Sequence, residues 1–240
     1  MKPQRVVSRD AWLEARMALL AEEKALTRAR DRLAAARRAL PWVAVEKDYR
    51  FDTPEGRARL ADLFQGRDRL IVNHFMFHPD WEAGCVGCSF AADQMEGALA
   101  HVNAAGVTLA KVSRAPLAKL LAYQARMGWR TPWVSSHGSD FNRDFGVSFT
   151  PEELAAGPVA YNYGETGEGF DELPGYSVFA RDEEGRVYHC YSSYARGNEE
   201  VLTAFMYLDM TPLGRNEAGT MSWVRRHDEY AEPSRAGAAP

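Results

Sequence analysis

Residues 75–93, with the sequence FMFHPDWEAGCVGCSFAAD, decide how the rest of this chain is interpreted. The apolar stretch 70–77 predicts a buried strand, and residues 89–102 predict a helix. Cys85 and Cys88 lie between these two elements, three positions apart. If both occupy the first turn of the helix, they share one face and lie within disulfide reach. The segment therefore predicts a strand, a short loop and a helix that begins at a cysteine pair.

A helix N-terminus favours the thiolate form of cysteine, because its unpaired N–H groups and positive end stabilise negative charge. The thiolate is the species that attacks a disulfide. We therefore expect Cys85 to attack a partner disulfide and Cys88, one turn deeper, to resolve the mixed disulfide. Two alternatives stay open: a non-enzymatic binding module, and a metal site in which the pair is completed by other residues. The candidate additional ligands, none at a regular spacing from the pair, are His74, His78, His137, His189 and Cys190.

Composition narrows the class of protein. The 240 residues are 46% hydrophobic and 26% charged, which is typical of a globular protein with one sizeable domain and additions. The formal net charge of −4 gives no general affinity for nucleic acid, and no apolar run reaches the ~18 residues that span a bilayer. Three cysteines are too few for a disulfide-stapled secreted scaffold, and the first residues, MKPQR, lack an apolar signal core. We expect a cytoplasmic protein with no nucleic-acid or membrane partner.

The first 41 residues form a helical extension. Residues 8–40 consist mainly of strong helix formers, and Pro41 ends the pattern. Apolar residues recur every seven positions, acidic residues crowd the first half, and arginines crowd the second half. The stripe is formed by Trp12, Leu19, Leu26, Leu33 and Leu40. Such a helix docks on its own domain or packs on a second copy of the chain, which would give a homodimer.

Residues 42–210 alternate between strand and helix patterns. We expect a strand over 43–51, a helix that begins at Thr53-Pro54, a strand over 107–112 and a helix over 114–127. The remaining elements are an aromatic-rich insertion over 127–174 with a capping box at 150–153, a β-hairpin over 176–191, and a last helix capped by Asn198. This order predicts an α/β fold, a mixed sheet with helices on both faces. A C-terminal segment, 211–240, follows, and its last ten residues should be disordered.

The order of elements around the cysteine pair, followed by Pro174 and a hairpin, resembles the thioredoxin fold. Several segments are more closely similar to a bacterial thioredoxin-like family of unknown function, described as predicted dithiol–disulfide oxidoreductases. These segments are Ala39-Leu-Pro-Trp-Val43, Phe75-Met-Phe, Cys85-Val-Gly-Cys88-Ser, Val112-Ser-Arg-Ala-Pro116, Met127-Gly-Trp129, Ser139-Asp-Phe-Asn142 and Gly214-Arg-Asn-Glu217. The resemblance covers nearly the whole chain.

The resemblance implies a thioredoxin-like domain whose Pro174 is cis, faces the dithiol and shapes a groove for the partner. The partner would be a protein or small-molecule disulfide or thiol, and no bound cofactor or metal is implied. The sequence departs from thioredoxins in having Gly84 before the pair and Val86-Gly87 within it. It also lacks a buried acid in the preceding strand and the hydroxyl residue of the peroxiredoxin pattern.

Five further residues are candidates for supporting roles. His74 and His78 would share a strand face and could act as acid or base beside the pair. Trp81, in the loop before Cys85, could grip a partner, and Arg114 could pair with an acidic substrate group or with a surface carboxylate. Cys190 is expected to be a buried, inert thiol.

Overall fold

The computed structural model describes residues 4–166 and 169–230 of a chain that divides into two units, residues 1–41 and 42–240. The first unit contains one long helix, α1 (Arg9–Arg38), which confirms the expected N-terminal helix. Its N-cap is Ser8, whose hydroxyl accepts a hydrogen bond from the Ala11 N–H at 3.3 Å. The last ten residues, 231–240, which the sequence predicts to be disordered, lie outside the described residues.

The second unit is built on an eight-stranded mixed sheet, which confirms the α/β fold class. Its spatial order is β1-β10-β9-β4-β5-β6-β2-β3. The three neighbours β4, β5 and β6 are parallel, and the flanking strands are antiparallel. The strands are β1 (Val43–Ala44), β2 (Arg50–Thr53), β3 (Gly56–Arg59), β4 (Arg69–His74), β5 (Val107–Ser113), β6 (Trp133–Ser135), β9 (Gly175–Arg181) and β10 (Val187–Tyr194). A separate hairpin consists of β7 (Val159–Tyr161) and β8 (Gly164–Thr166).

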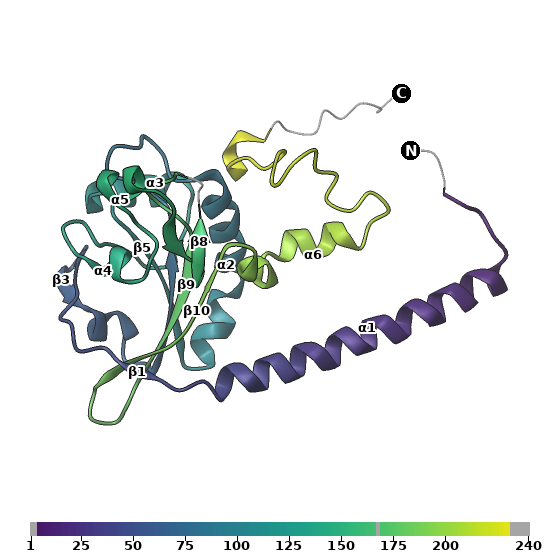
Figure 1. Cartoon of the computed structure of the whole chain (residues 1–240), viewed down its shortest axis with the longest axis horizontal. Helices are drawn as coiled ribbons and strands as arrows, with labels where there is room; N and C mark the ends of the chain where they lie inside the picture. The colour runs from purple at the N-terminus through teal and green to yellow at the C-terminus, as the bar shows by residue number, and fades with distance from the viewer. Residues whose placement is uncertain (1–3, 167–168, 231–240) are drawn as a thin grey trace. The chain divides into compact units, whose positions relative to one another are not determined.

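Helices cover both faces of this sheet. The helices α2 (Val86–Ala104) and α3 (Leu117–Arg126) contribute to one apolar cluster, together with Phe75 and Phe77. The short helices η1 (Leu60–Phe64) and α4 (Phe141–Asp144) contribute to the cluster on the other face. Figure 1 shows α2 and α4 on opposite sides of the strands. Because side chains alternate along a strand, each residue of β4 faces one cluster or the other.

The C-terminal part of the second unit contains short helices. Among them, α5 (Pro151–Ala156) begins at the predicted capping box, in which Thr150 and Glu153 exchange hydrogen bonds. Three further helices follow the hairpin of β9 and β10, namely η2 (Ala195–Val201), α6 (Thr203–Asp209) and η3 (His227–Glu229). The expectation that Asn198 caps the last helix is wrong, since Asn198 lies inside η2.

Two further local predictions are wrong. The expected strand over 43–51 is broken into β1 and the start of β2, because residues 45–49 leave the sheet. The expected helix does not begin at Thr53-Pro54, which lie in the turn between β2 and β3, and only its later part, with Leu60, Leu63 and Phe64, is helical, as η1. In the turn, the Thr53 hydroxyl donates to Gly56 O at 2.8 Å, and Gly56 has a φ of +117°, which favours glycine. Proline suits the second position of a turn as well as the first turn of a helix, so the sequence alone was ambiguous.

The described helices contain no candidate membrane span: none combines the length and the apolar character that crossing a bilayer requires.

Candidate functional site

The cysteine pair lies where the chain passes from β4, through a loop, into α2. Cys85 is the N-cap residue of α2, and Cys88 is the third residue of the helix. The Cys85 N–H donates to Met76 O at 3.1 Å, which ties the start of the helix to the segment that leaves β4. The Cys85 Sγ accepts a hydrogen bond from the Cys88 N–H at 3.5 Å. Both cysteines are free thiols on the first turn of α2.

The surroundings of the Cys85 sulfur favour its thiolate. A hydrogen bond from the Cys88 thiol is the largest cause, and the N–H groups of Cys88 and Gly87 and the charge of Arg226 act in the same direction. Burial opposes ionisation but is outweighed, so the pKa of Cys85 falls from its ordinary 9.0 to about 6. At pH 7 Cys85 is therefore mainly a thiolate.

The Cys88 sulfur has the opposite environment. Its side chain is buried, and its Sγ accepts a hydrogen bond from the Met76 N–H at 3.5 Å. The hydrogen bond that it donates to Cys85, burial, and the negative charge of Cys85 raise the pKa of Cys88 well above 9.0. The Glu172 carboxylate acts in the same direction. The pair thus consists of one half-buried thiolate and one buried thiol that stabilises it.

Pro174 immediately precedes β9, whose first residue, Gly175, pairs with His74 at the end of β4. The proline therefore lies beside the strand from which the cysteine loop departs. No cis peptide bond occurs among the described residues, so the Leu173–Pro174 bond is trans, and the cis arrangement implied by the resemblance is wrong. The backbone here is fixed by the Leu173 N–H, which donates to Val147 O at 2.9 Å, and by Tyr161, whose hydroxyl donates to Pro174 O at 2.7 Å.

Trp81 and Arg114 occupy different surroundings. Trp81 is half-buried in the loop before Cys85 and packs against the same apolar cluster as the pair. Its carbonyl oxygen accepts a hydrogen bond from Lys119 Nζ at 2.9 Å. Arg114 forms an ion pair with Glu172, whose carboxylate also accepts a hydrogen bond from Ser148 Oγ at 2.9 Å. The partner of Arg114 is thus a buried carboxylate rather than the surface carboxylate that the sequence suggested.

The two histidines before the pair do not share a face. Since β4 ends at His74, the alternation that would align the two residues stops there. His74 points to the side of the sheet away from α2, where its ring lies against Phe141 and Phe145 and its Nε2 is 2.8 Å from Ser177 Oγ. Burial lowers its pKa to about 3, so it is neutral at physiological pH. His78 lies in the loop, with its Nε2 3.4 Å from Asp171.

Cys190 lies at the irregularity in the middle of β10, between His189 and Tyr191, which pair with Phe179 and Val178 of β9. Its side chain is half-buried and not buried as expected. Burial raises the pKa of Cys190, and its Sγ donates to Tyr188 O at 3.7 Å. Both properties are those of an unreactive thiol.

The aromatic residues at the start of the insertion surround a buried lysine. Lys111, in β5, is completely buried, and its Nζ lies 4.3 Å and 4.9 Å from the ring centres of Trp129 and Trp133. The nearest carboxylate oxygen, of Glu96 in α2, is 4.0 Å away. Burial lowers the pKa of Lys111 to about 7. The two tryptophans are therefore part of the core between α2, α3 and the sheet.

Two residues near the pair were missed by the sequence analysis. Glu172 and Arg226 come from segments distant in sequence, and no spacing relative to the cysteines identifies them. Glu172 is 1% exposed, and burial raises its pKa to about 7. Arg226 belongs to a charged run, RRHDE over 225–229, which by itself does not indicate a position beside the cysteines. In the ranges 4–166 and 169–230, no three His, Cys, Asp or Glu side chains are grouped as metal ligands would be.

The sequence matches, over residues 1–230, the family described as "Bacterial protein of unknown function (DUF899)". No curated protein matches it. The solved structures that resemble it include a peroxiredoxin Q from Xanthomonas campestris, with 13% identity and a TM-score of 0.43, covering 68% of this chain and 94% of that chain. A peroxidoxin BcpB from Mycobacterium tuberculosis has 12% identity and a TM-score of 0.45, with 70% and 97% covered. A protein assigned as the thiol:disulfide interchange protein DsbE from Chlorobium tepidum has 14% identity and a TM-score of 0.41, with 69% and 95% covered.

Proposed function

The chain belongs to this bacterial family of unknown function, and we propose that it is a thiol–disulfide exchange enzyme with Cys85 as nucleophile and Cys88 as resolving residue. The observation that carries the proposal is the opposed environment of the two sulfurs on one helical turn. The Cys85 thiolate is half-buried at the start of α2, whereas the Cys88 thiol is buried beneath it. This is the division of roles that two-step disulfide exchange requires.

The reaction proceeds through a mixed disulfide. The Cys85 thiolate attacks one sulfur of a partner disulfide; a bond forms between these sulfurs, the partner S–S bond breaks, and the second partner sulfur leaves as a thiolate. Cys88 then gives its proton to the first released partner thiolate or to water and attacks the Cys85 sulfur, which breaks the mixed disulfide and releases the remaining partner thiolate. The partner gains two electrons and the enzyme is left with a Cys85–Cys88 disulfide, which a thiol donor reduces by the reverse sequence.

The remaining candidates are assigned supporting positions. Pro174, beside the end of β4, and Trp81, on the loop before Cys85, would border the site at which a protein or small-molecule disulfide binds. Arg114 would act through Glu172, because these two side chains form an ion pair. His78 stays a candidate acid or base, and His74 would act only indirectly from the other face of the sheet.

The test is a redox titration of the pair against glutathione in metal-free buffer, with Cys88→Ser as the control. We expect a reversible two-electron transition that the control lacks. Because a cysteine pKa of about 6 lies between those of thioredoxin and DsbA, the potential should lie between ~−270 mV and ~−120 mV. Absence of a transition, with both thiols protected until a chelator is added, would refute the proposal in favour of a metal site. Partner binding that survives loss of both cysteines, without any transition, would indicate a binding module.

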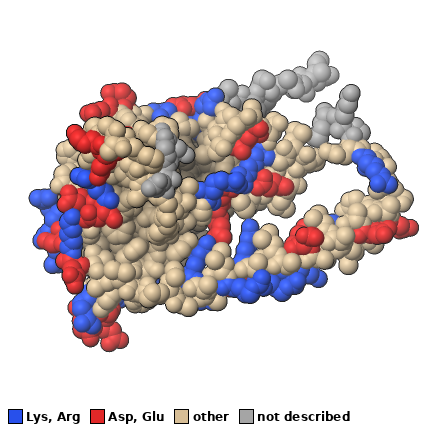
Figure 2. Space-filling view, in the orientation of Figure 1, with Lys and Arg blue, Asp and Glu red and all other residues tan. Residues whose placement is uncertain are grey.

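We further propose that α1 pairs with a second copy of itself. None of the residues of α1 is buried, and its apolar stripe, one residue in every seven, is narrower than the two-residue seam of a full coiled coil. Figure 2 shows acidic side chains toward the start of the helix and basic ones along its second half. Antiparallel pairing places each acidic half against a basic half. Sedimentation of the full chain at micromolar concentration should show a dimer that Leu26→Glu dissociates; a monomeric parent protein would refute this pairing.

A further inference from the structure

The last described residues of the chain lie across the N-terminal end of α2. We name residues 219–230 the C-terminal strap. Its Val224 is buried in a cluster with Phe90 of α2, and Met221 packs against the same cluster. Met221 also covers the backbone between the two cysteines, since a Cβ added at Gly87 would lie 3.3 Å from the Met221 sulfur and 3.9 Å from Cys85 Sγ. The strap is therefore packed directly beside the reactive sulfur.

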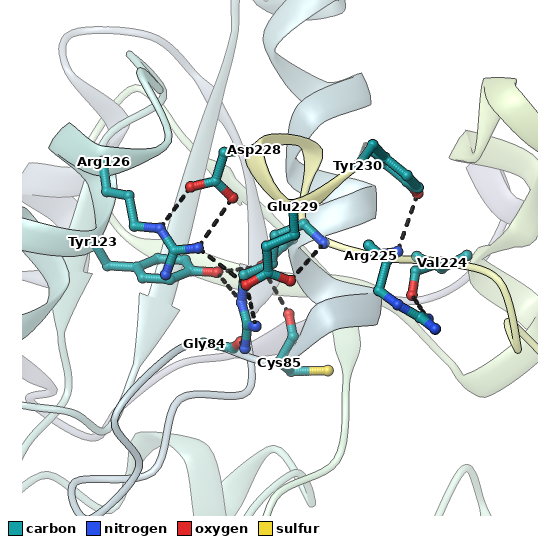
Figure 3. A network of polar contacts seen from close by, with 11 residues as sticks. Gly84, Cys85, Tyr123, Arg126, Val224, Arg225, Asp228, Glu229 and Tyr230 are labelled. Carbon is teal, nitrogen blue, oxygen red and sulfur yellow. Dashed lines mark hydrogen bonds and ion pairs between the residues drawn. The ribbon is translucent and has the colours of Figure 1, made fainter. Parts of the chain in front are cut away.

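One side chain of the strap reaches the backbone around Cys85. The Arg226 Nη2 donates to Gly84 O at 2.8 Å, and its Nε donates to the Tyr123 hydroxyl at 2.7 Å. Tyr123 OH lies 2.9 Å from Ser89 Oγ, which donates to Cys85 O at 2.8 Å. Figure 3 shows this network converging on the Gly84–Cys85 peptide from the strap and from α3. Arg226 thus holds the carbonyl before Cys85 directly and the carbonyl of Cys85 through two hydroxyl groups.

We propose that Arg226 is a positioning residue of the dithiol, which fixes the backbone on both sides of Cys85 and keeps a positive charge beside its sulfur. This inference rests on the proposed function, because it assigns to Arg226 a part in preparing the nucleophile. The Arg226 side chain is only 17% exposed, so solvent screens its charge less than that of a surface arginine. Its charge is among the causes that lower the pKa of Cys85.

The strap is held in place by contacts that do not involve the cysteine backbone. Arg126, in α3, binds both oxygens of Asp228, at 2.7 Å and 3.0 Å, and binds Glu229 at 3.1 Å. Glu229 also pairs with Arg226 at 2.9 Å. At the same end, His227 Nδ1 lies 2.7 Å from Asp93 of α2. Arg226 shares Glu229 with this anchor, but the contacts of Asp228 with Arg126 and of His227 with Asp93 do not involve Arg226 and remain when it is replaced.

The neighbouring Arg225 provides a matched control. Its guanidinium donates to the carbonyl oxygens of Ser222 and Val224, within the strap itself. The experiment compares Arg226→Met, Arg226→Lys and Arg225→Met in the full-length protein. The alkylation rate of Cys85 by iodoacetamide is followed by mass spectrometry from pH 4 to pH 10, and the glutathione equilibrium of the pair is measured at pH 7.

For Arg226→Met we expect the midpoint of the alkylation profile to rise by about one pH unit, which lowers the thiolate fraction at pH 6 about fivefold. Because the thiolate belongs to the reduced state, losing its stabilisation should disfavour reduction by glutathione by about fivefold at pH 7. Arg226→Lys, which keeps the charge, should have an alkylation midpoint closer to that of the parent protein than to that of Arg226→Met. The midpoint of Arg225→Met should equal that of the parent protein.

An unchanged midpoint in a folded Arg226→Met protein would overturn the proposal. An equal shift in Arg225→Met would also overturn it, since that result would indicate a general loss of positive charge. If Arg226→Met fails to fold, the neutral and polar variant Arg226→Gln decides, and an unchanged midpoint in that variant would overturn the proposal. Failure of the proposed function is recognised separately, because the parent protein would then form no Cys85–Cys88 disulfide while its alkylation profile remained measurable.

Discussion

Replacing Cys88 by alanine should raise the pKa of Cys85. The thiol of Cys88 donates the hydrogen bond that contributes most to lowering this pKa to about 6. A hydrogen bond to a charged group contributes about 1.5–3 kcal/mol, which corresponds to roughly one to two pKa units. The Cys88→Ala variant should therefore have a Cys85 pKa of about 7–8, with a thiolate fraction at pH 6 that is about 5- to 50-fold lower.

The rate of alkylation changes less than the thiolate fraction. A thiolate of higher pKa is intrinsically more nucleophilic, with a Brønsted coefficient of about 0.4–0.5, so each unit raises its rate constant about threefold. The rate at pH 6 should fall only about two- to sixfold, while the plateau at high pH rises. The midpoint of the rate–pH profile is consequently the informative quantity.

Cys88→Ser is the matched control, since its hydroxyl can still donate a hydrogen bond to Cys85. Its midpoint should stay within about half a unit of the parent protein, whereas that of Cys88→Ala should move. Burial raises the pKa of Cys190, so this second thiol is expected to react at higher pH than Cys85, and its alkylation is followed separately in every sample. A Cys88→Ala midpoint that remains near 6 would refute the reasoning, because the backbone N–H groups and Arg226 would then be sufficient to stabilise the thiolate.

Two further changes test the packing around the site. In the folded chain Lys111 has a pKa of about 7 and loses its proton as the pH rises from 7 to 9, whereas the unfolded chain keeps this proton over the same range. The free energy of unfolding should therefore increase by about 2 kcal/mol between pH 7 and pH 9, relative to the Lys111→Met variant. Urea unfolding of both proteins at the two pH values checks this, and parallel curves would contradict it. Gly84→Ala should cost about 1–3 kcal/mol, because its Cβ would lie 2.6 Å from the buried Phe75 ring. Gly97→Ala is the control, because a Cβ added at Gly97 would have no neighbouring atom within 4 Å. This change should be neutral or should stabilise α2 by up to about 1 kcal/mol. Both variants are compared by thermal unfolding, and a similar loss of stability in the two would exclude a steric cause.

Local sequence predicted the elements around the cysteine pair because their signals lie within one short segment. The apolar strand, the cysteine at the N-cap and the helix after it are all determined by neighbouring residues. The face of His74 could not be predicted in the same way, since it depends on where β4 ends and on which side α2 packs. Thr53-Pro54 was ambiguous because its signal for a helix start is also a signal for a turn.

The charged groups around the pair depend on tertiary structure. Glu172 and Arg226 are brought to the cysteines by the connection before β9 and by the C-terminal strap, and neither contact follows a sequence period. An arginine in a charged run is usually solvated, so RRHDE over 225–229 gave no reason to place one member beside a thiolate. Residues that tune a site from a distant segment are therefore the part of this protein that sequence patterns could not show.

The two steps of the proposed exchange are ordered by the coupling between the sulfurs. The hydrogen bond to Cys85 and the negative charge of Cys85 both raise the pKa of Cys88, in addition to burial. When Cys85 enters a mixed disulfide, its negative charge is lost and it no longer needs the hydrogen bond from Cys88. Both contributions then disappear, and the pKa of Cys88 must fall while that sulfur lies one turn from the bond it has to break. Cys88 is thus held as a thiol until Cys85 has reacted, and the first step itself prepares the second.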